Sequence, residues 1–269
     1  MSYVSLVDVT ASQEEPRINT PIALITGGSR GLGKSMVRSV AGCGTDVILT
    51  YQSRKADAFA LVSEVEGMGR RAAALLLDVG DPGAFDAFAK EVREVLRDWG
   101  VEQFQSLVNN AGHGLQASIE ETTGEQFDEI VDVHVKGPFF LTQKLLPLIS
   151  DGGRVLNVSS ALAREGNTIP GSAAYASAKG AVEVMTRYMA REFGPRGISV
   201  NAISPGGIET DFNGAAMRDP EVQEMAVSIT ALGRVGQAED VGGAVAALLS
   251  PEMGWVNGQR IEVSGGQSL

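Results

Sequence analysis

Short apolar runs alternate along this chain with longer segments in which apolar and polar residues mix. From Pro21 onward, each short run has the length and the aliphatic content of a strand buried on both faces of a sheet. The longer segments repeat their apolar residues at helical spacing, and the clearest stripe contains Phe85, Phe88, Val92, Val95, Leu96 and Trp99. Strands that alternate with amphipathic helices predict a parallel sheet joined by crossover helices.

The elements can be placed approximately along the chain. We expect strands over 22–26, 47–51, 73–78, 106–109, 154–159, 199–203 and 260–263, and helices over 31–43, 56–69, 85–99, 125–149, 174–194 and 238–250. No linker or repeat interrupts the pattern, which predicts a single doubly wound α/β domain of the Rossmann type over residues 20–269. About seven parallel strands should carry helices on both faces. Residues 1–19 are expected to form a poorly ordered N-terminal arm.

Composition narrows the classes of partner. The net charge of −11 argues against nucleic acid and anionic membranes, because both reward clustered Lys and Arg. Cys43 is the sole cysteine, so neither an intrachain disulfide nor a site with several thiolate ligands can form. The chain shows neither a signal peptide nor an apolar run of about 20 residues. We therefore expect a soluble cytoplasmic protein.

A glycine-rich turn, TGGSRGLG, runs from Thr26 to Gly33, between the first strand and the first helix. Glycines allow a sharp turn and close backbone approach to a ligand, and the helix start favours negative charge. The turn thus predicts a phosphate-binding loop, although an ordinary strand-to-helix turn has a similar composition. The residues expected to bind are Gly27, Ser29, Arg30, Gly31, Leu32 and Gly33.

Tyr175 and Lys179 are four residues apart in a helical pattern, so both side chains leave the same face. A phenol has a pKa near 10, and a nearby ammonium group favours its ionised form. This pair can therefore handle a proton, and it follows the strand end that carries Ser159 and Ser160.

Taken in order, these motifs resemble the short-chain dehydrogenase/reductase family, in its NADP(H)-preferring branch of 3-oxoacyl reductases and ketoreductases. Glycines 27, 31 and 33 match the family's T-G-x-x-x-G-x-G spacing. The further matches lie after successive strands, and the resemblance spans residues 21 to 266: Asp78-Val79, Asn109-Asn110-Ala111-Gly112, Ser159-Ser160, Tyr175 with Lys179, and Pro205-Gly206.

The resemblance implies a role for each of these segments. Asp78 and Val79 are expected at the adenine. The Asn110, Ala111 and Gly112 turn is expected beneath the cofactor, although Asn109 and Gly112 also fit a purely structural role in the turn. The nicotinamide amide is assigned to the segment that contains Pro205, Gly206, Ile208 and Thr210.

The same resemblance implies carbonyl/alcohol chemistry. Tyr175 is expected to donate a proton to the carbonyl oxygen, or to remove one from the alcohol. Lys179 is expected to lower the pKa of Tyr175, and both residues contact the cofactor, Lys179 through the ribose hydroxyls. Ser160 is expected to hold the substrate oxygen. The loop from Ser160 to Tyr175 is longer than in many relatives, which bears on specificity.

His134 stands where family members usually carry an Asn that places a water between the lysine and solvent. Two interpretations remain open. An imidazole with a pKa near 6.5 would join this relay and add pH dependence. Alternatively, a backbone carbonyl holds the water and His134 fills space. The other histidine, His113, fits a solvent-facing loop, and we expect no metal.

The cofactor choice depends on the end of the second strand, which reads Tyr51-Gln52-Ser53-Arg54-Lys55 and contains no acid. Basic side chains pair with a 2′-phosphate, whereas a carboxylate accepts from a 2′-hydroxyl. Ser53 and Arg54, together with Arg30, therefore predict NADP(H), with NAD(H) use left open.

Residues 207–230 match the family's substrate lid, where Phe212, Met217, Met225 and Ile229 fit either an apolar wall or ordinary packing. We expect a small or medium apolar ketone, aldehyde or alcohol as substrate, and a homotetramer or homodimer. Two other functions remain open: a noncatalytic NADP(H)-binding regulatory protein, and a nicotinamide-assisted epimerase or dehydratase.

Overall fold

The computed structural model describes residues 20–269, and the predicted N-terminal arm lies outside this range. Seven strands form one parallel sheet in the order β3-β2-β1-β4-β5-β6-β7. The strands are β1 (Ile22–Ile25), β2 (Asp46–Tyr51), β3 (Ala72–Leu76), β4 (Phe104–Asn109), β5 (Ile149–Val158), β6 (Ser199–Pro205) and β7 (Arg260–Val263). The predicted doubly wound fold is confirmed, and its strand order reverses between β1 and β4.

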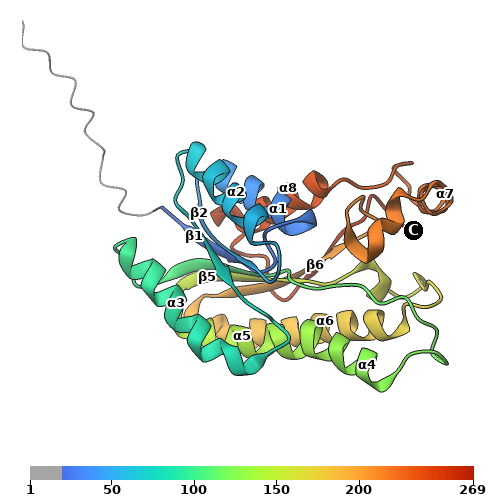
Figure 1. Cartoon of the computed structure of the whole chain (residues 1–269), viewed down its shortest axis with the longest axis horizontal. Helices are drawn as coiled ribbons and strands as arrows, with labels where there is room; N and C mark the ends of the chain where they lie inside the picture. The colour runs from blue at the N-terminus through green and yellow to red at the C-terminus, as the bar shows by residue number, and fades with distance from the viewer. Residues whose placement is uncertain (1–19) are drawn as a thin grey trace, which may run out of the picture.

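Helices cover both faces of the sheet (Figure 1). One layer contains α1 (Gly31–Gly42), α2 (Lys55–Gly67) and α8 (Ala238–Leu248); the other contains α3 (Phe85–Asp98), α4 (Gly124–Val131), α5 (Gly137–Leu145) and α6 (Ala173–Phe193). Helix α7 (Pro220–Ser228) lies apart from both layers, beside the last residues of the chain.

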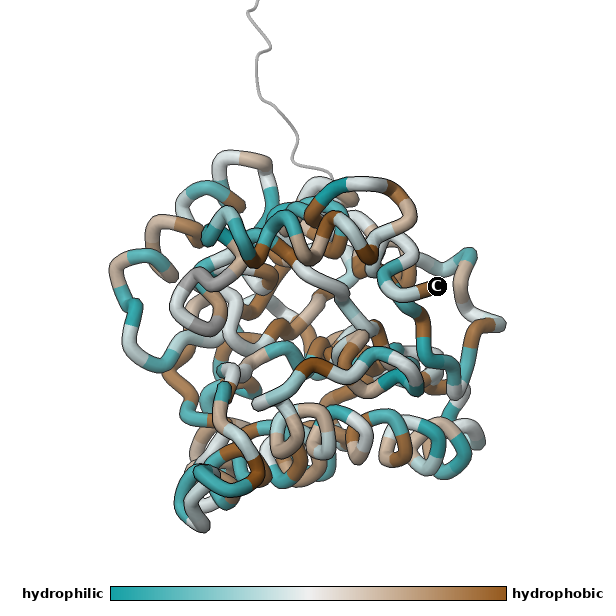
Figure 2. Tube along the Cα trace, turned by 90° about the vertical axis from the view of Figure 1, so that its right-hand side faces the viewer, coloured by the Kyte–Doolittle hydropathy of each residue, from teal (hydrophilic) through white to brown (hydrophobic). Residues whose placement is uncertain are grey.

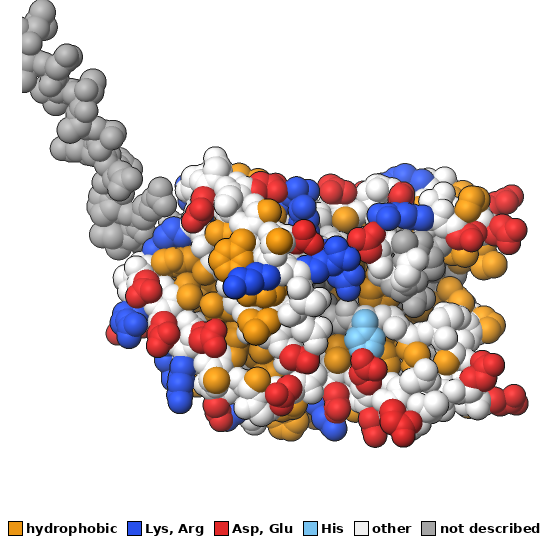
Figure 3. Space-filling model, in the orientation of Figure 1, with side chains coloured by type: hydrophobic (Ala, Val, Ile, Leu, Met, Phe, Trp, Pro, Cys, Tyr) orange, Lys and Arg blue, Asp and Glu red, His pale blue; other side chains and the backbone are white. Residues whose placement is uncertain are grey.

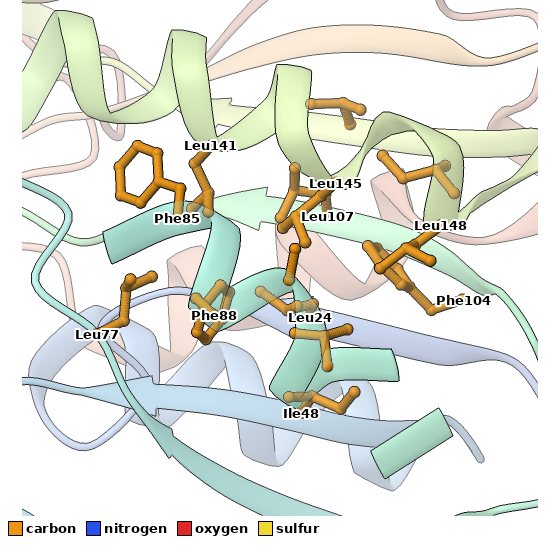
Figure 4. Close-up of a cluster of buried hydrophobic side chains, with 14 of the residues drawn as sticks. Leu24, Ile48, Leu77, Phe85, Phe88, Phe104, Leu107, Leu141, Leu145 and Leu148 are labelled. Atoms are coloured by element: carbon orange, nitrogen blue, oxygen red, sulfur yellow. The ribbon is translucent and has the colours of Figure 1, made fainter. Parts of the chain in front are cut away.

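Two apolar cores result from the alternation of side chains along each strand. In β1, Ile22 and Leu24 join the core beneath α3, α5 and α6, whereas Ala23 and Ile25 join the core beneath α1, α2 and α8. Figure 4 shows the first core, which contains Phe85 and Phe88 of α3, Leu107 of β4 and Leu141 of α5. Figure 2 shows hydrophobic stretches of the chain crossing the interior of the molecule.

The helix predicted over 125–149 is the main error of the sequence analysis. The structure has α4, then a π-helical turn at Asp132–Lys136, then α5 and a 3₁₀ turn at Leu146–Leu148. Pro147 has no N–H to continue an α-helix, and β5 already begins at Ile149. The continuous apolar pattern concealed both the break and the strand start.

Helix α7 was also not predicted. Asp219 begins it by accepting backbone hydrogen bonds from Glu221 and Val222, with Pro220 in the first turn. Over residues 20–269, no helix combines the length and apolarity that crossing a membrane requires.

Candidate active site

The glycine-rich turn connects β1 to α1, and it hydrogen-bonds to the end of β2. Gly27 donates to Thr50 Oγ1 at 3.0 Å, and its φ of +65° suits glycine. A Cβ on Gly33 would lie 2.1 Å from the Gly27 carbonyl oxygen, so this close packing admits only glycine. Within the described residues, the Arg30 side chain makes no capping bond to α1, which leaves N–H groups of the first turn for a phosphate.

Basic and hydroxyl groups gather at the end of β2, as predicted from its sequence. Ser53 and Arg54 follow β2 and are exposed, and Arg30 is exposed in the glycine-rich turn, whose Gly28 N–H donates to Thr50 of β2. Arg54 lies 3.5 Å from Asp57, but both side chains are half exposed, and such a pair is too weak to withhold the guanidinium from a phosphate. The donor set fits a nucleotide with a 2′-phosphate.

Asp78 lies beside this end of β2, because Gln52 Nε2 donates to Asp78 Oδ2 at 2.9 Å. The other carboxylate oxygen accepts from the Gly80 N–H at 2.8 Å. Val79, the next residue, is buried in the core. Asp78 is therefore held in place beside the second strand, where the adenine was expected.

The Asn-Asn-Ala-Gly turn after β4 is braced by hydrogen bonds to the chain itself. Asn110 Nδ2 donates to the Thr26 carbonyl at 2.8 Å, and the Ala111 N–H donates to Thr26 Oγ1 at 3.0 Å. Asn109 Nδ2 donates to Thr142 of α5 at 2.9 Å and to Asn157 of the neighbouring strand β5 at 2.8 Å. The structural role considered for Asn109 is confirmed.

The segment after β6 returns to the glycine-rich turn. A Cβ on Gly31 would lie 3.8 Å from Thr210 Cβ, so Thr210 and the turn are neighbours. Pro205 ends β6, and the Gly206 N–H donates to Val263 at 3.1 Å. Ile208 forms a parallel bridge with Gly236. The segment 205–210 thus lies beside the glycine-rich turn, and its contact with the nicotinamide stays a prediction.

Ser160, Tyr175 and Lys179 converge after β5. Ser160 lies close enough to Tyr175 to favour the ionised form of its phenol. Lys179 Nζ lies 5.6 Å from the centre of the Tyr175 ring and donates to the Val158 carbonyl at 2.7 Å. Lys179 is buried, and the Val158 carbonyl of β5 holds its Nζ in place.

Burial governs the ionisation of this pair. It raises the pKa of Tyr175 above its ordinary value of 10, and the nearby Ser160 only partly offsets the rise. Burial also lowers the pKa of Lys179 to about 7. Desolvation thus dominates at Tyr175 in the polypeptide, and the lowering of its pKa by Lys179 stays a prediction.

His134 is buried within the π-helical turn and points at the active site. Its ring meets the Tyr175 ring edge-on at 5.2 Å between centres. Nε2 lies 2.7 Å from the His113 carbonyl oxygen, which can only accept, so Nε2 carries the proton. Nδ1 has no hydrogen-bond partner among residues 20–269. A Cβ on Gly112 would lie 2.4 Å from His134 Cε1, so Gly112 makes room for this ring.

The pKa of His134 falls to about 2, mainly through burial and then through the nearby Lys179 charge. The imidazole therefore stays neutral across the physiological range. This favours the interpretation in which His134 fills space. His113 is partly exposed, as expected, and its Nε2 lies 3.4 Å from Glu129.

One aromatic side chain of the predicted lid borders Tyr175. Phe212 lies 5.9 Å from the Tyr175 ring, at the start of the predicted lid. Met225 and Ile229 are exposed further along it, at 63% and 38%. Figure 3 shows a hollow between the two helical layers on its right-hand side.

Sequence reasoning missed a charged cluster behind the catalytic strand. The Ser159 hydroxyl donates to Glu183 Oε1 at 2.7 Å, and Arg260 of β7 pairs with the same oxygen at 2.7 Å. Glu183 lies one helical turn beyond Lys179, and that spacing was the only signal in the sequence. The Glu183–Arg260 ion pair therefore connects α6 to β7.

A parallel sheet with a phosphate-binding turn after β1 and a Ser-Tyr-Lys set after β5 defines a class of nucleotide-dependent oxidoreductase. Residues 27–268 match the family model described as enoyl-(acyl carrier protein) reductase. The chain belongs to the short-chain dehydrogenase/reductase family, as its motifs predicted.

Individual relatives are reductases. The hydroxynaphthalene reductase-like protein Arp2 of Metarhizium brunneum is 34% identical over 270 residues, covering 96% of this chain and 99% of that protein. Versicolorin reductase 1 of Aspergillus parasiticus is 33% identical over 260 residues, covering 93% and 97%. The structure of the angucycline C-6 ketoreductase LanV with bound NADP has a TM-score of 0.87 and 33% identity, covering 92% and 95%.

Proposed function

We propose that this protein reduces a carbonyl group with NADPH and can run the reverse alcohol oxidation. The convergence of Ser160, Tyr175 and Lys179 beside the glycine-rich turn carries the proposal. When bound, the nicotinamide supplies or accepts the hydride. The raised pKa keeps Tyr175 protonated at neutral pH, which is the form that gives a proton to a carbonyl oxygen.

The other residues bind and orient. Ser160 holds the substrate oxygen against the Tyr175 hydroxyl. Lys179, fixed by the Val158 carbonyl, presents its remaining protons to the ribose hydroxyls. His134 fills the space behind Tyr175 and holds the His113 turn through its Nε2–H.

Conversion of a carbonyl panel, followed by NADPH absorbance, tests this function. The Tyr175→Phe variant removes the proton donor and keeps the ring, so turnover should fall by at least about 100-fold. NADPH binding should persist in that variant. Full turnover without the hydroxyl would refute the mechanism.

The cofactor assignment to NADP(H) is supported by Arg30, Ser53 and Arg54, with no acid at the end of β2. The NADP bound in LanV agrees with it. Arg54→Ala should weaken NADPH binding by about tenfold and leave NADH binding nearly unchanged, because only NADPH carries the 2′-phosphate. Equal wild-type affinities for the two nucleotides would contradict the assignment.

The substrate class we propose is a ketone on a fused aromatic ring system. The names of the relatives point to hydroxynaphthalene and angucycline chemistry. In this chain, the Phe212 ring beside Tyr175 offers a flat apolar surface for such a substrate. Bicyclic aromatic ketones should therefore give higher kcat/KM than short aliphatic ketones, and Phe212→Ala should narrow that difference.

We also propose a cytoplasmic homotetramer or homodimer that uses no metal. Exposed apolar side chains on α5 and α6, namely Phe139, Phe140, Val184 and Tyr188, support self-association through that layer. The single cysteine, Cys43, suits a reducing compartment.

A further inference from the structure

The Gln267 side chain reaches two walls of the active site that are far apart in sequence. Its Oε1 accepts a hydrogen bond from the Gly207 N–H at 2.8 Å. Its Nε2 donates to Asn167 Oδ1 at 3.4 Å. Gly207 belongs to the segment after β6, and Asn167 belongs to the loop between Ser160 and Tyr175. One amide therefore spans both walls.

Asn167 continues this link to the catalytic serine. Its Nδ2 donates to the carbonyl oxygen of Ala161, the residue directly after Ser160, at 2.9 Å. Asn167 and Gln267 are only 2% and 5% exposed. A buried amide that loses a partner keeps an unsatisfied polar group, so the connection is stiffer than a surface contact.

Gly206 is shaped to admit the Gln267 side chain. A Cβ on Gly206 would lie 2.7 Å from Gln267 Oε1 and 2.8 Å from Ser264 Cα. The glycine that the family pattern assigns to the nicotinamide segment therefore also has a local packing role. A larger residue at position 206 would therefore displace the Gln267 side chain.

Arg164 reinforces the bridge from outside. Its Nη2 donates to the carbonyl oxygens of Gln267 and Ser268, the latter at 2.8 Å. The Ser268 N–H in turn donates to Ile229 at the end of the lid, at 2.6 Å. Arg164 and Asn167 both lie in the loop that is longer here than in many relatives. The extended loop thus supplies the groups that hold residues 267 and 268.

We propose that Asn167 and Gln267 are positioning residues that set the spacing between Ser160 and the 205–210 segment. This inference rests on the proposed function, in which Ser160 holds the substrate oxygen and the 205–210 segment holds the nicotinamide amide. Reacting atoms must be held within a few tenths of an ångström, and a shift of about 1 Å can cost as much as 100-fold in rate. Loss of the bridge therefore lowers turnover more than binding.

Three variants and one control test the proposal. Gln267→Met and Asn167→Leu each remove the amide contacts at similar side-chain size, and the double variant removes both. Gln105→Met is the control: Gln105 Oε1 also accepts a backbone N–H, from Ile22 at 2.6 Å, but at the opposite end of the sheet.

Each single variant should lose about tenfold in kcat, with carbonyl KM and NADPH Kd changed less than about threefold. The double variant should be no slower than the slower single variant, because either change already breaks the bridge. The control should retain its kcat. The proposal would be overturned by any of three results. These are an unchanged kcat in both single variants, an effect on KM or Kd alone, and a double variant whose kcat loss is the product of the two single losses.

Hydrogen exchange provides a readout that needs no turnover. In Gln267→Met, amides in both 161–171 and 207–212 should exchange faster than in Gln105→Met. Unchanged exchange, or faster exchange in one segment only, would refute the bridge. If the wild type reduced no carbonyl, but exchange in Gln267→Met became faster in both segments, the proposed function would fail and the physical bridge would be supported. If Gln267→Met does not fold, Gln267→Glu takes its place, because it keeps the acceptor for the Gly207 N–H and removes the donor to Asn167.

Discussion

Lys179 is the residue whose ionisation should be visible in solution near neutral pH. Burial lowers its pKa to about 7, so its ammonium is present below that pH and is lost above it. Loss of the charge removes a charge-assisted hydrogen bond to the ribose. NADPH Kd should therefore rise by about tenfold from roughly pH 6 to roughly pH 9.

Fluorescence titration of NADPH against pH measures this change. Lys179→Arg keeps a positive charge over the whole range, so its Kd should vary much less. The same pH dependence in both proteins would assign the titration to another group.

For His134, unlike Lys179, we expect no titration near neutral pH. Its pKa of about 2 leaves the imidazole neutral over the working range. His134→Asn should leave the shape of the kcat/KM profile against pH unchanged. His134→Ala should unfold at lower temperature, because it leaves a cavity beside Gly112 and costs about 2–4 kcal/mol. An inflection near pH 6.5 that the Asn variant loses would restore the relay interpretation.

At the scale of elements, the junction between β1 and α1 depends on a glycine that no other residue can replace. Gly33→Ala would place a methyl group 2.1 Å from the Gly27 carbonyl oxygen, and the turn must open to relieve the clash. We expect at least tenfold weaker NADPH binding and a loss of about 1–3 kcal/mol in unfolding free energy.

Gly42→Ala is the matched control. It lies at the other end of α1, and a Cβ there meets no atom of the described chain within 4 Å. Alanine has the higher helix propensity, so this variant should be neutral or slightly stabilised. Denaturant unfolding and NADPH titration of both variants provide the comparison. Equal effects would show that the tight contact at Gly33 is unimportant.

The π-helical turn at Asp132–Lys136 leaves no mark in the apolar periodicity of the chain. Such a turn inserts one residue into a helix and is common at functional sites. Here it turns His134 into the space behind Tyr175. The apolar periodicity of residues 125–145 is nearly unchanged by one inserted residue, so the sequence predicted a regular helix.

At the scale of the whole molecule, the apolar residues left exposed on α5 and α6 predict self-association. Tyr188→Glu would bury a charge in that interface and should shift the protein towards monomer, as measured by light scattering during gel filtration. Met68→Glu, at the exposed residue directly after α2 in the other layer, is the control. A Tyr188→Glu protein of unchanged mass would place the interface elsewhere.

The sequence by itself determined the α/β class, most strands, the phosphate turn and the Ser160, Tyr175 and Lys179 set. The class and the strands depend on local spacing, since periodicity places side chains without long-range information. The roles expected of Ser160, Tyr175 and Lys179 came from the family resemblance, because a Tyr and a Lys four residues apart are common on helix surfaces. Only the tertiary structure decided the pKa directions of Tyr175, Lys179 and His134, because desolvation depends on what packs around each group. It alone brought Asn167 to Gln267, a contact that spans 100 residues and leaves no periodic trace in the chain.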